Sequence, residues 1–370
     1  MSQPAFTLHT SFSPLISLYD TFLLDQFGVI HNGSQSLHGA VGCIESMLDR
    51  NKKLAILSNT SSPAHVALKR LKKYGLRDDM FAGGLVSSGE ECAKYVRENY
   101  CCNFNEDASI VKAKKALWFT WKESETQNPL QFLSHIENGI DGDDNLIGGR
   151  GVIGVAESVE EADFILLHGS EVWRQSRELP TSDDLDLNFL YNEDFTMIDP
   201  LLDQSLERNL PMVCANPDFV VGLPGGVVGN MPGKIAERYA QKGGIVHHFG
   251  KPSPRHFHAC LDNLGIVFDA NAKSIPGVAH VGDSLEHDVA GANAAGVDSV
   301  FVLGGIHARE LGLVPTGSED VGTVIADDDV GGHEIACITE KELTIKLQSF
   351  FEERGIWPTH VVPRLSLGFD

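Results

Sequence analysis

Short apolar runs that alternate with helix-like stretches constrain the fold of this chain more than any other feature. An apolar run over 19–25 is followed by a helix-like stretch over 38–50, a second run over 53–57 and a helix-like stretch over 63–74. The same alternation returns between 254 and 303. Strands that are joined through helices pair in parallel, so the pattern predicts an α/β fold with a Rossmann-like, doubly wound parallel sheet.

The middle of the chain does not follow this alternation of apolar runs and helix-like stretches. Residues 87–246 carry acidic loops, a glycine-rich stretch and apolar runs of their own, such as those over 162–167 and 211–215. A length of 370 residues suits two domains, or one domain with a large insertion. We therefore expect a discontinuous core domain formed by 1–86 and 247–370, with an α/β domain inserted over 87–246.

The charge and composition exclude several classes of function. The chain has 29 Lys and Arg against 51 Asp and Glu, a formal net charge of −22, which argues against binding to nucleic acid or to an anionic membrane surface. It has no apolar run of about 18 residues, the length that a transmembrane helix needs, and its first 20 residues contain no Lys or Arg. The seven cysteines form no CxxC motif, so neither a disulfide framework nor a zinc site is expected, and we expect a cytoplasmic protein.

Polar residues stand at comparable places after the predicted strands or just before a helix, namely Asp25, Ser58 with Asn59, Lys251 and Asp283. In an open α/β sheet, the ligand crevice lies outside the carboxyl ends of the strands. Carboxylates at this edge suit a hard cation such as Mg²⁺, and lysine and amide groups suit phosphate oxygens. A carboxylate there can itself attack phosphorus to give an aspartyl-phosphate. The residues therefore predict a magnesium-assisted phosphoryl-transfer site.

These residues lie in motifs that resemble those of the haloacid dehalogenase superfamily. The four motifs are, in order, 25–33 (DQFGVIHNG), 58–60 (SNT), 250–252 (GKP) and 282–288 (GDSLEHD). With the long insertion between the second and third motifs and the run ANPD over 215–218, the chain is closest to subfamily IIA, the 4-nitrophenylphosphatase-like and N-acetylglucosamine-phosphate-phosphatase-like enzymes. The resemblance implies that the inserted domain is a large cap of type C2 over the core.

The resemblance also implies roles for individual residues. Asp25 corresponds to the nucleophile and is also a ligand of Mg²⁺. The other implied metal-site groups are the carbonyl of Phe27 and the side chains of Asp283 and Asp288, the last acting directly or through water. The implied phosphate binders are Ser58, Asn59, Lys251 and Gly28. In the cap, Asn216 and Asp218 are expected to contact the substrate.

Position 27 departs from the phosphatase pattern. Phosphatases of this family usually carry a second aspartate two residues after the nucleophile, which protonates the leaving alcohol and then activates water. Phe27 stands in that place and can do neither. General acid–base help contributes roughly 10²–10⁴-fold to a rate, so proton transfer is expected to be weakened or moved elsewhere. His31 and Asp218 are the candidates to supply it.

We therefore expect a Mg²⁺-dependent phosphatase that hydrolyses a small phosphorylated metabolite through an aspartyl-phosphate at Asp25. Two alternatives remain open. The first is a catalytically impaired relative that binds a phosphorylated ligand or serves as an interaction protein. The second is a transferase or an enzyme that cleaves a C–P bond. A homodimer through the cap is also left open, and no nucleic-acid or membrane partner is expected.

Overall fold

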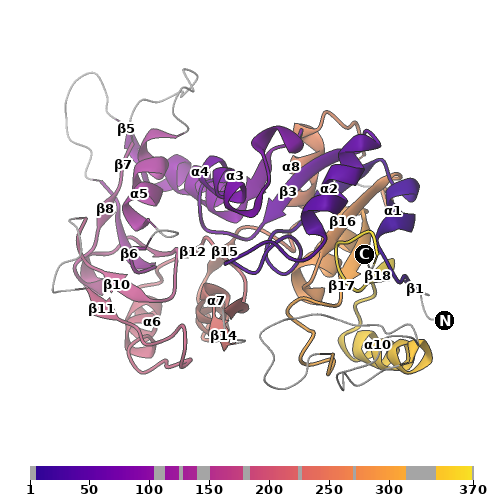
Figure 1. Cartoon of the computed structure of the whole chain (residues 1–370). Helices are drawn as coiled ribbons and strands as arrows, with labels where there is room; N and C mark the ends of the chain where they lie inside the picture. The colour runs from indigo at the N-terminus through magenta and orange to yellow at the C-terminus, as the bar shows by residue number, and fades with distance from the viewer. Residues whose placement is uncertain are drawn as a thin grey trace.

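Two sheets, each covered by helices, form the part of the chain that the structure describes (Figure 1). The structure is a computed structural model and describes residues 6–103, 113–124, 128–139, 151–177, 184–223, 227–269, 272–313 and 339–368. In Figure 1 the first sheet lies among indigo, orange and yellow segments and the second among magenta and pink ones. Among the described residues, no helix combines the length and the apolar character that a membrane crossing requires.

The first sheet is parallel throughout and has the strand order β1-β18-β17-β16-β2-β3-β4. Its strands are β1 (Thr7–Leu8), β2 (Thr21–Leu24), β3 (Lys53–Ser58), β4 (Leu85–Ser87), β16 (Val278–Gly282), β17 (Asp298–Val302) and β18 (His360–Val362). Apart from β1 at one edge, chain order runs outward from β2 in both directions, which is the doubly wound topology that the alternation of strands and helices predicts.

Helices cover both faces of this sheet because successive residues of each strand point to opposite sides. The helices are α1 (Ser13–Leu18), α2 (Ala40–Asp49), α3 (Ala64–Arg70), α8 (Pro254–Asn263), α9 (Ala290–Ala295) and α10 (Glu340–Arg354). Phe22 and Leu24 of β2 pack in one buried cluster with Ile44 of α2. Leu23, between them, packs in another cluster with Phe257 of α8. The predicted α/β core is confirmed.

Two of the predicted helices differ in detail from a regular α-helix. The helix expected over 63–74 is α3 followed by a 3₁₀ turn, η1 (Leu71–Tyr74), which ends at Gly75 with a φ of +84°. In the second alternating region, expected over 254–303, one helix begins as a π-helix, η5 (Leu285–Val289), and continues as α9. A further 3₁₀ turn is η2 (Asp78–Met80).

The second sheet belongs to the inserted region and has the order β11-β10-β6-β9-β12-β15, with β8 paired to β6. Its strands are β6 (Lys115–Thr120), β8 (Gly154–Val155), β9 (Phe164–Leu167), β10 (Val172–Arg174), β11 (Leu185–Asp186), β12 (Met212–Cys214) and β15 (Val246–His248). Strand β15 pairs in parallel with β12, so this sheet extends two residues beyond the boundary predicted at 246.

Helices cover both faces of the second sheet as well. They are α4 (Ser88–Tyr100), α5 (Pro129–Asn138), α6 (Asp199–Glu207) and α7 (Pro232–Gln241), with a 3₁₀ turn, η3 (Val159–Glu161). Trp118 of β6 packs with Phe132 of α5, whereas Phe119, the next residue, packs with Ile235 of α7. Two small strand pairs complete the region: β13 (Val220–Leu223) with β14 (Val227–Asn230), and β5 (Cys102–Asn103) with β7 (Gly151–Val152).

Candidate active site

The carboxyl ends of three neighbouring core strands bring the predicted residues to one edge of the sheet. Asp25 directly follows β2, Ser58 ends β3 and Asp283 directly follows β16, and these strands are adjacent and parallel. The backbone N–H of Asp25 donates to the carbonyl of Val281 at 2.9 Å, which continues the pairing of β2 with β16. Lys251 enters from the chain that leaves β15 toward α8. The parallel topology therefore gathers residues that are far apart in the sequence.

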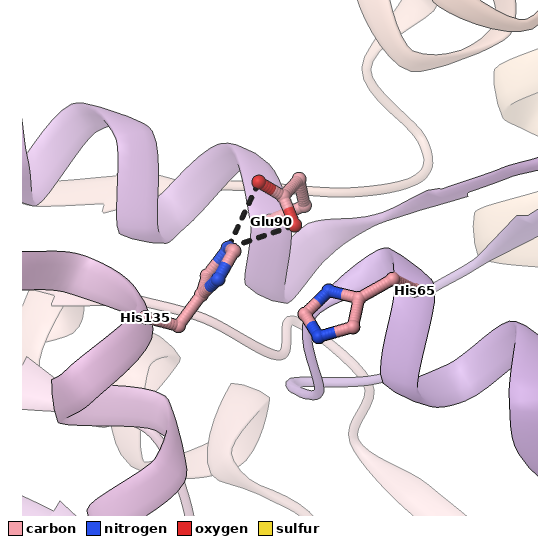
Figure 2. Close-up of side chains that lie close together, drawn as sticks. All are labelled: His65, Glu90 and His135. Atoms are coloured by element: carbon pink, nitrogen blue, oxygen red, sulfur yellow. Dashed lines mark hydrogen bonds and ion pairs between the residues drawn. The ribbon is translucent and has the colours of Figure 1, made fainter. Parts of the chain in front are cut away.

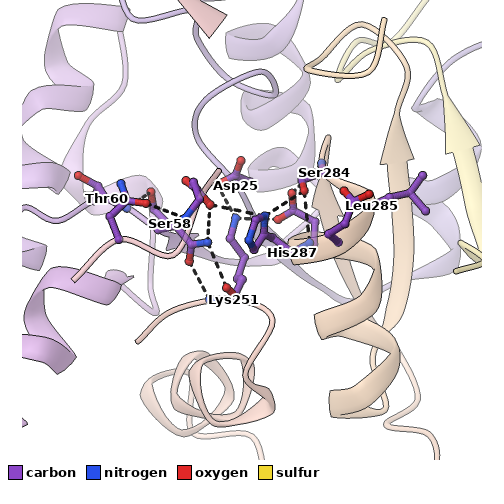
Figure 3. A network of polar contacts seen from close by, with 12 residues as sticks. Asp25, Ser58, Thr60, Lys251, Ser284, Leu285 and His287 are labelled. Atoms are coloured by element: carbon purple, nitrogen blue, oxygen red, sulfur yellow. Dashed lines mark hydrogen bonds and ion pairs between the residues drawn. The ribbon is translucent and has the colours of Figure 1, made fainter. Parts of the chain in front are cut away.

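A buried lysine links two carboxylates at the centre of the site, and Figure 3 shows it beside Asp25. Lys251 Nζ donates to Asp25 Oδ1 at 2.7 Å and to Asp288 Oδ1 at 2.6 Å. Burial disfavours the charged ammonium, but the two carboxylates outweigh it and raise the pKa of Lys251 well above its ordinary value. An ammonium carries three N–H groups, so one remains available for a ligand oxygen.

Asp283 completes a cluster of three carboxylates. Oxygen atoms of Asp25, Asp283 and Asp288 lie within 4.8 Å of one another. The backbone N–H of Ile306 donates to Asp283 Oδ2 at 2.9 Å, and that of Ser284 donates to Asp288 Oδ2 at 2.9 Å. Main-chain hydrogen bonds therefore fix two of the three carboxylates in place.

Burial dominates the ionisation of this cluster. It raises the pKa of Asp25 well above its ordinary value, although Lys251 opposes the shift. It also raises the pKa of Asp283 to about 7, and the charge of Asp288 adds to this. Burial works against ionised Asp288 too, but Lys251 and His280 outweigh it and hold the pKa of Asp288 below its ordinary value. When all are ionised, three carboxylates against one ammonium leave two negative charges, and this all-oxygen donor set fits a hard divalent cation such as Mg²⁺.

Gly28 leaves space for the Asp283 carboxylate in the cluster, because it has no side chain. Its φ is +79°, in the left-handed region, and a Cβ added there would lie 1.9 Å from Asp283 Oδ2. Its N–H donates to the carbonyl of His31 at 2.9 Å. The structure thus shows a packing role for Gly28, and its predicted contact with phosphate stays a prediction.

Replacing Gly28 by alanine should therefore push Asp283 out of the cluster. The new methyl group would occupy the space of the carboxylate, and the left-handed backbone alone costs roughly 1–2 kcal/mol for a residue with a Cβ. We expect Gly28→Ala to lower the free energy of unfolding by at least that amount and to weaken Mg²⁺ binding.

A matched control lies in α2, where a Cβ added at Gly42 would meet no atom within 4 Å. Gly42→Ala should raise the free energy of unfolding by roughly 0.5–1 kcal/mol, because alanine is the better residue in a helix. Urea denaturation of both variants, with and without Mg²⁺, makes the comparison. Two variants of equal stability and equal Mg²⁺ response would contradict the role assigned to Gly28.

Asn59 ties Lys251 to the cap. Asn59 Oδ1 accepts the backbone N–H of Lys251 at 2.7 Å, and Nδ2 donates to the Lys251 carbonyl at 3.2 Å and to Asp218 Oδ1 at 2.7 Å. Both N–H groups of the Asn59 side chain are thus hydrogen-bonded. The predicted contact of Asn59 with phosphate would therefore use its backbone N–H. Ser58 Oγ accepts the N–H of Thr60 at 3.3 Å, and its own O–H can still donate to a ligand (Figure 3).

Asp218 brings the cap to the core site. In addition to the hydrogen bond from Asn59, Asp218 Oδ1 lies 3.6 Å from Nδ1 of His287. His287 Nδ1 also lies 3.2 Å from Ser284 Oγ. Figure 3 shows Ser284 and His287 side by side. Asn216 is buried, and its Oδ1 accepts the N–H of Asp218 at 3.0 Å. Asp218 is therefore placed at the site, whereas Asn216 shapes the loop that carries it.

The side chain at position 27 packs against the loop that follows Asp25 and lies near the cap. The Phe27 ring meets the His31 ring edge-on at a centroid distance of 5.6 Å, and a Cβ added at Gly222 of β13 would lie 3.9 Å from it. His31 stacks on Tyr74 at 4.1 Å, and its Nδ1 accepts the N–H of Gly33 at 3.1 Å. Burial lowers the pKa of His31 to about 4, so the ring is neutral near pH 7. This disfavours His31 as the replacement acid.

Two histidines to which the sequence pattern gave no role also stand at the site. His280 lies within β16, is fully buried and places Nε2 2.8 Å from Asp288 Oδ1. Its only signal in the sequence is a polar residue inside an apolar run. His287 belongs to the fourth motif but is not one of its expected functional positions, and only the fold shows that it faces Asp218.

Two family profiles match the segments of the chain that carry the site. A sequence profile of haloacid dehalogenase-like hydrolases matches residues 22–123, and a profile of HAD-hydrolase-like proteins matches residues 248–328. The two segments contain Asp25, Ser58, Lys251 and Asp283. No curated protein matches the chain.

Solved structures share the fold over most of the chain. A hydrolase of the haloacid dehalogenase-like family from Brucella suis is 22% identical, with a TM-score of 0.60 over 84% of this chain and 94% of its own. A possible sugar phosphatase of the HAD superfamily from Cytophaga hutchinsonii is 16% identical, with a TM-score of 0.60 over 99% of this chain and 100% of its own. A p-nitrophenyl phosphatase from Archaeoglobus fulgidus is 20% identical, with a TM-score of 0.54 over 94% and 97%. Two segments of the chain thus match profiles of haloacid dehalogenase-like hydrolases, and the chain shares its fold with solved proteins of that superfamily.

Proposed function

We propose that this protein is a Mg²⁺-dependent phosphatase that hydrolyses a small phosphomonoester through an aspartyl-phosphate at Asp25. The observation that carries the proposal is the buried cluster in which Lys251 holds Asp25 beside two further carboxylates. Solved relatives described as phosphatases support the same class of substrate. The net charge of −22 makes this local ammonium important, because an anionic substrate must be attracted to an acidic protein.

In the proposed site, Asp25, Asp283 and the carbonyl of Phe27 would hold Mg²⁺, and Asp288 would support it. When bound, Mg²⁺ neutralises charge on the phosphoryl oxygens and on the carboxylates. Lys251 has one N–H left for a phosphoryl oxygen, and the Ser58 hydroxyl can donate to another.

The chemistry then proceeds in two steps at Asp25. One carboxylate oxygen forms a bond to phosphorus while the bond from phosphorus to the ester oxygen breaks, and the leaving oxygen takes up a proton. Water next attacks phosphorus, which releases phosphate and restores the carboxylate. We propose that Asp218 supplies and accepts this proton less effectively than an aspartate at position 27 would, because this cap carboxylate reaches the core through Asn59 and His287 and already accepts a hydrogen bond from Asn59.

Position 27 provides the test of this chemistry. An aryl phosphate leaves as a stabilised phenolate, whereas an alkyl phosphate needs a proton in the transition state. Wild type should therefore prefer 4-nitrophenyl phosphate over sugar or alkyl phosphates. Phe27→Asp should raise alkyl-phosphate turnover by about 10²-fold and change aryl turnover much less. The measurement is kcat/KM across a series of leaving groups.

Phe27→Leu is the matched control, because it also removes the ring but adds no carboxylate. It should leave the preference for aryl phosphates unchanged, and thermal melts should show that both variants are folded. If wild type already hydrolyses alkyl phosphates as fast as aryl phosphates, proton transfer is intact. Asp218→Asn should then remove that activity selectively.

A binding protein without turnover is the second candidate function, and Phe27 favours it. The ring stands where phosphatases of this kind usually carry the acid–base residue, and it lies near Gly222 of the cap. This function predicts Mg²⁺-dependent binding of phosphate or a phosphomonoester with no hydrolysis of 4-nitrophenyl phosphate. Hydrolysis that depends on both Mg²⁺ and Asp25 would exclude it.

A further inference from the structure

Three side chains outside the carboxylate cluster converge from three different helices. Figure 2 shows them together: His65 from α3, Glu90 from α4 and His135 from α5. One donor atom of each lies within 4.8 Å of the others. His135 Nε2 and Glu90 Oε1 are 2.9 Å apart, and the rings of the two histidines have a centroid distance of 5.5 Å.

The surrounding structure holds these groups in place. Glu90 lies in the first turn of α4, where its N–H donates to Ser87 Oγ at 3.1 Å, and its Oε2 accepts the N–H of Ala64 at 3.2 Å. The His135 side chain is only 3% exposed. Arg97 is the nearby cation, and its guanidinium donates to the carbonyl of His135 at 2.7 Å. These contacts fix Glu90 and His135 before any ligand arrives.

We propose that His65, Glu90 and His135 form a binding site for a divalent transition-metal ion, with Zn²⁺ as the reference ion. Two imidazole nitrogens and one carboxylate oxygen are a donor set that Zn²⁺, Co²⁺ and Ni²⁺ accept, whereas Mg²⁺ prefers oxygen ligands alone. The ion takes the place of the proton that His135 now shares with Glu90. The chain thus has two cation sites of different chemistry, because the Asp25 cluster offers oxygen only.

The three side chains must move only a short distance to bind an ion. Metal–ligand bonds of 2.0–2.1 Å place tetrahedral ligand atoms about 3.4 Å apart, so the observed spread of up to 4.8 Å must close. His65 is half-buried and lies in the second position of α3, so the closure requires a movement of its side chain toward the other two. Water can complete the coordination.

The position of the site gives the ion a structural role. Helix α3 packs on the core sheet, where Ala67 joins the buried cluster of β3 and β4. Helices α4 and α5 pack together on the second sheet, through Cys92 and Phe132. An ion held by all three helices therefore links the core to the cap and stabilises the native state.

Cobalt provides the probe, because Co²⁺ bound to nitrogen and oxygen ligands absorbs visible light. The full chain, without a histidine tag and stripped of metal by a chelator, is titrated with Co²⁺ in excess Mg²⁺, and Zn²⁺ is then added in competition. We expect one equivalent of bound Co²⁺, its displacement by Zn²⁺, and a higher Tm with either ion. His65→Gln and Glu90→Gln should each weaken Co²⁺ binding by at least about tenfold.

His38→Gln is the matched control, because His38 is an exposed histidine. It should bind Co²⁺ like wild type. Absence of a stoichiometric Co²⁺ signal from wild type would overturn the proposal, as would wild-type binding by His65→Gln and Glu90→Gln. Binding that is lost in Asp283→Asn but kept in His65→Gln would place the ion in the carboxylate cluster and also overturn it. The readout is independent of turnover, so it separates this proposal from the proposed phosphatase.

Discussion

Asp25→Asn should abolish phosphatase turnover, with a loss of roughly 10³-fold or more, while the protein stays folded. Asparagine keeps the shape of the side chain and an oxygen that can accept the hydrogen bond from Lys251, but it lacks the nucleophilic charge. Burial raises the pKa of Asp25 well above its ordinary value, so the ionised group is costly when no cation is bound. In Mg²⁺-free buffer, the free energy of unfolding should therefore stay close to that of wild type or rise.

The measurements are hydrolysis of 4-nitrophenyl phosphate and urea denaturation with and without Mg²⁺. Mg²⁺ should stabilise wild type, because it binds the native state, and should stabilise the variant much less. Asp262→Asn is the matched control, since Asp262 is exposed on α8, and it should keep full turnover. If Asp25→Asn kept more than a few per cent of wild-type activity, Asp25 would not be the nucleophile.

Lys251→Met should have the largest effect on stability. Methionine fits the buried space but leaves Asp25 and Asp288 without their shared cation, which lies 2.7 Å and 2.6 Å from them. Removing one partner from a buried ion pair costs about 3–5 kcal/mol, because the remaining charges stay buried and uncompensated. The free energy of unfolding should fall by about that amount in Mg²⁺-free buffer, and turnover should be lost.

Mg²⁺ should restore part of this lost stability, because a divalent cation can neutralise the same carboxylates. Lys273→Met, at an exposed position, should change neither stability nor turnover. Urea denaturation over a series of Mg²⁺ concentrations tests both statements. A Lys251→Met protein as stable as wild type without Mg²⁺ would show that the cluster does not need the ammonium.

The polar residues that end the predicted strands account for most of what could be read about the site in advance. Asp25, Ser58 and Asp283 were expected together because parallel strands present their carboxyl ends at one edge, and the structure brings them there. The predicted roles of these residues in catalysis and metal binding depend on measurements of turnover and of Mg²⁺-dependent stability.

Contacts between residues far apart in the sequence could not be predicted from the sequence pattern. The contact of Asn59 with Lys251 spans 192 positions, and that of Asn59 with Asp218 spans 159. Periodicity reports which face of its own strand or helix a residue occupies, not which distant side chain faces it. For this reason the close approach of Asp283 to Gly28 and the link from Asn59 to Asp218 appear only in the folded chain.

The sequence by itself therefore determined the alternation of strands and helices over 19–74 and 254–303, the doubly wound core and the edge at which the polar residues gather, because local periodicity and parallel pairing control all three. Only the tertiary structure decided how the cap reaches that edge through Asp218, and only it brought His65, Glu90 and His135 together from three helices. The physical reason is that these contacts depend on the packing of one folded unit against another, and no spacing along the chain encodes that distance.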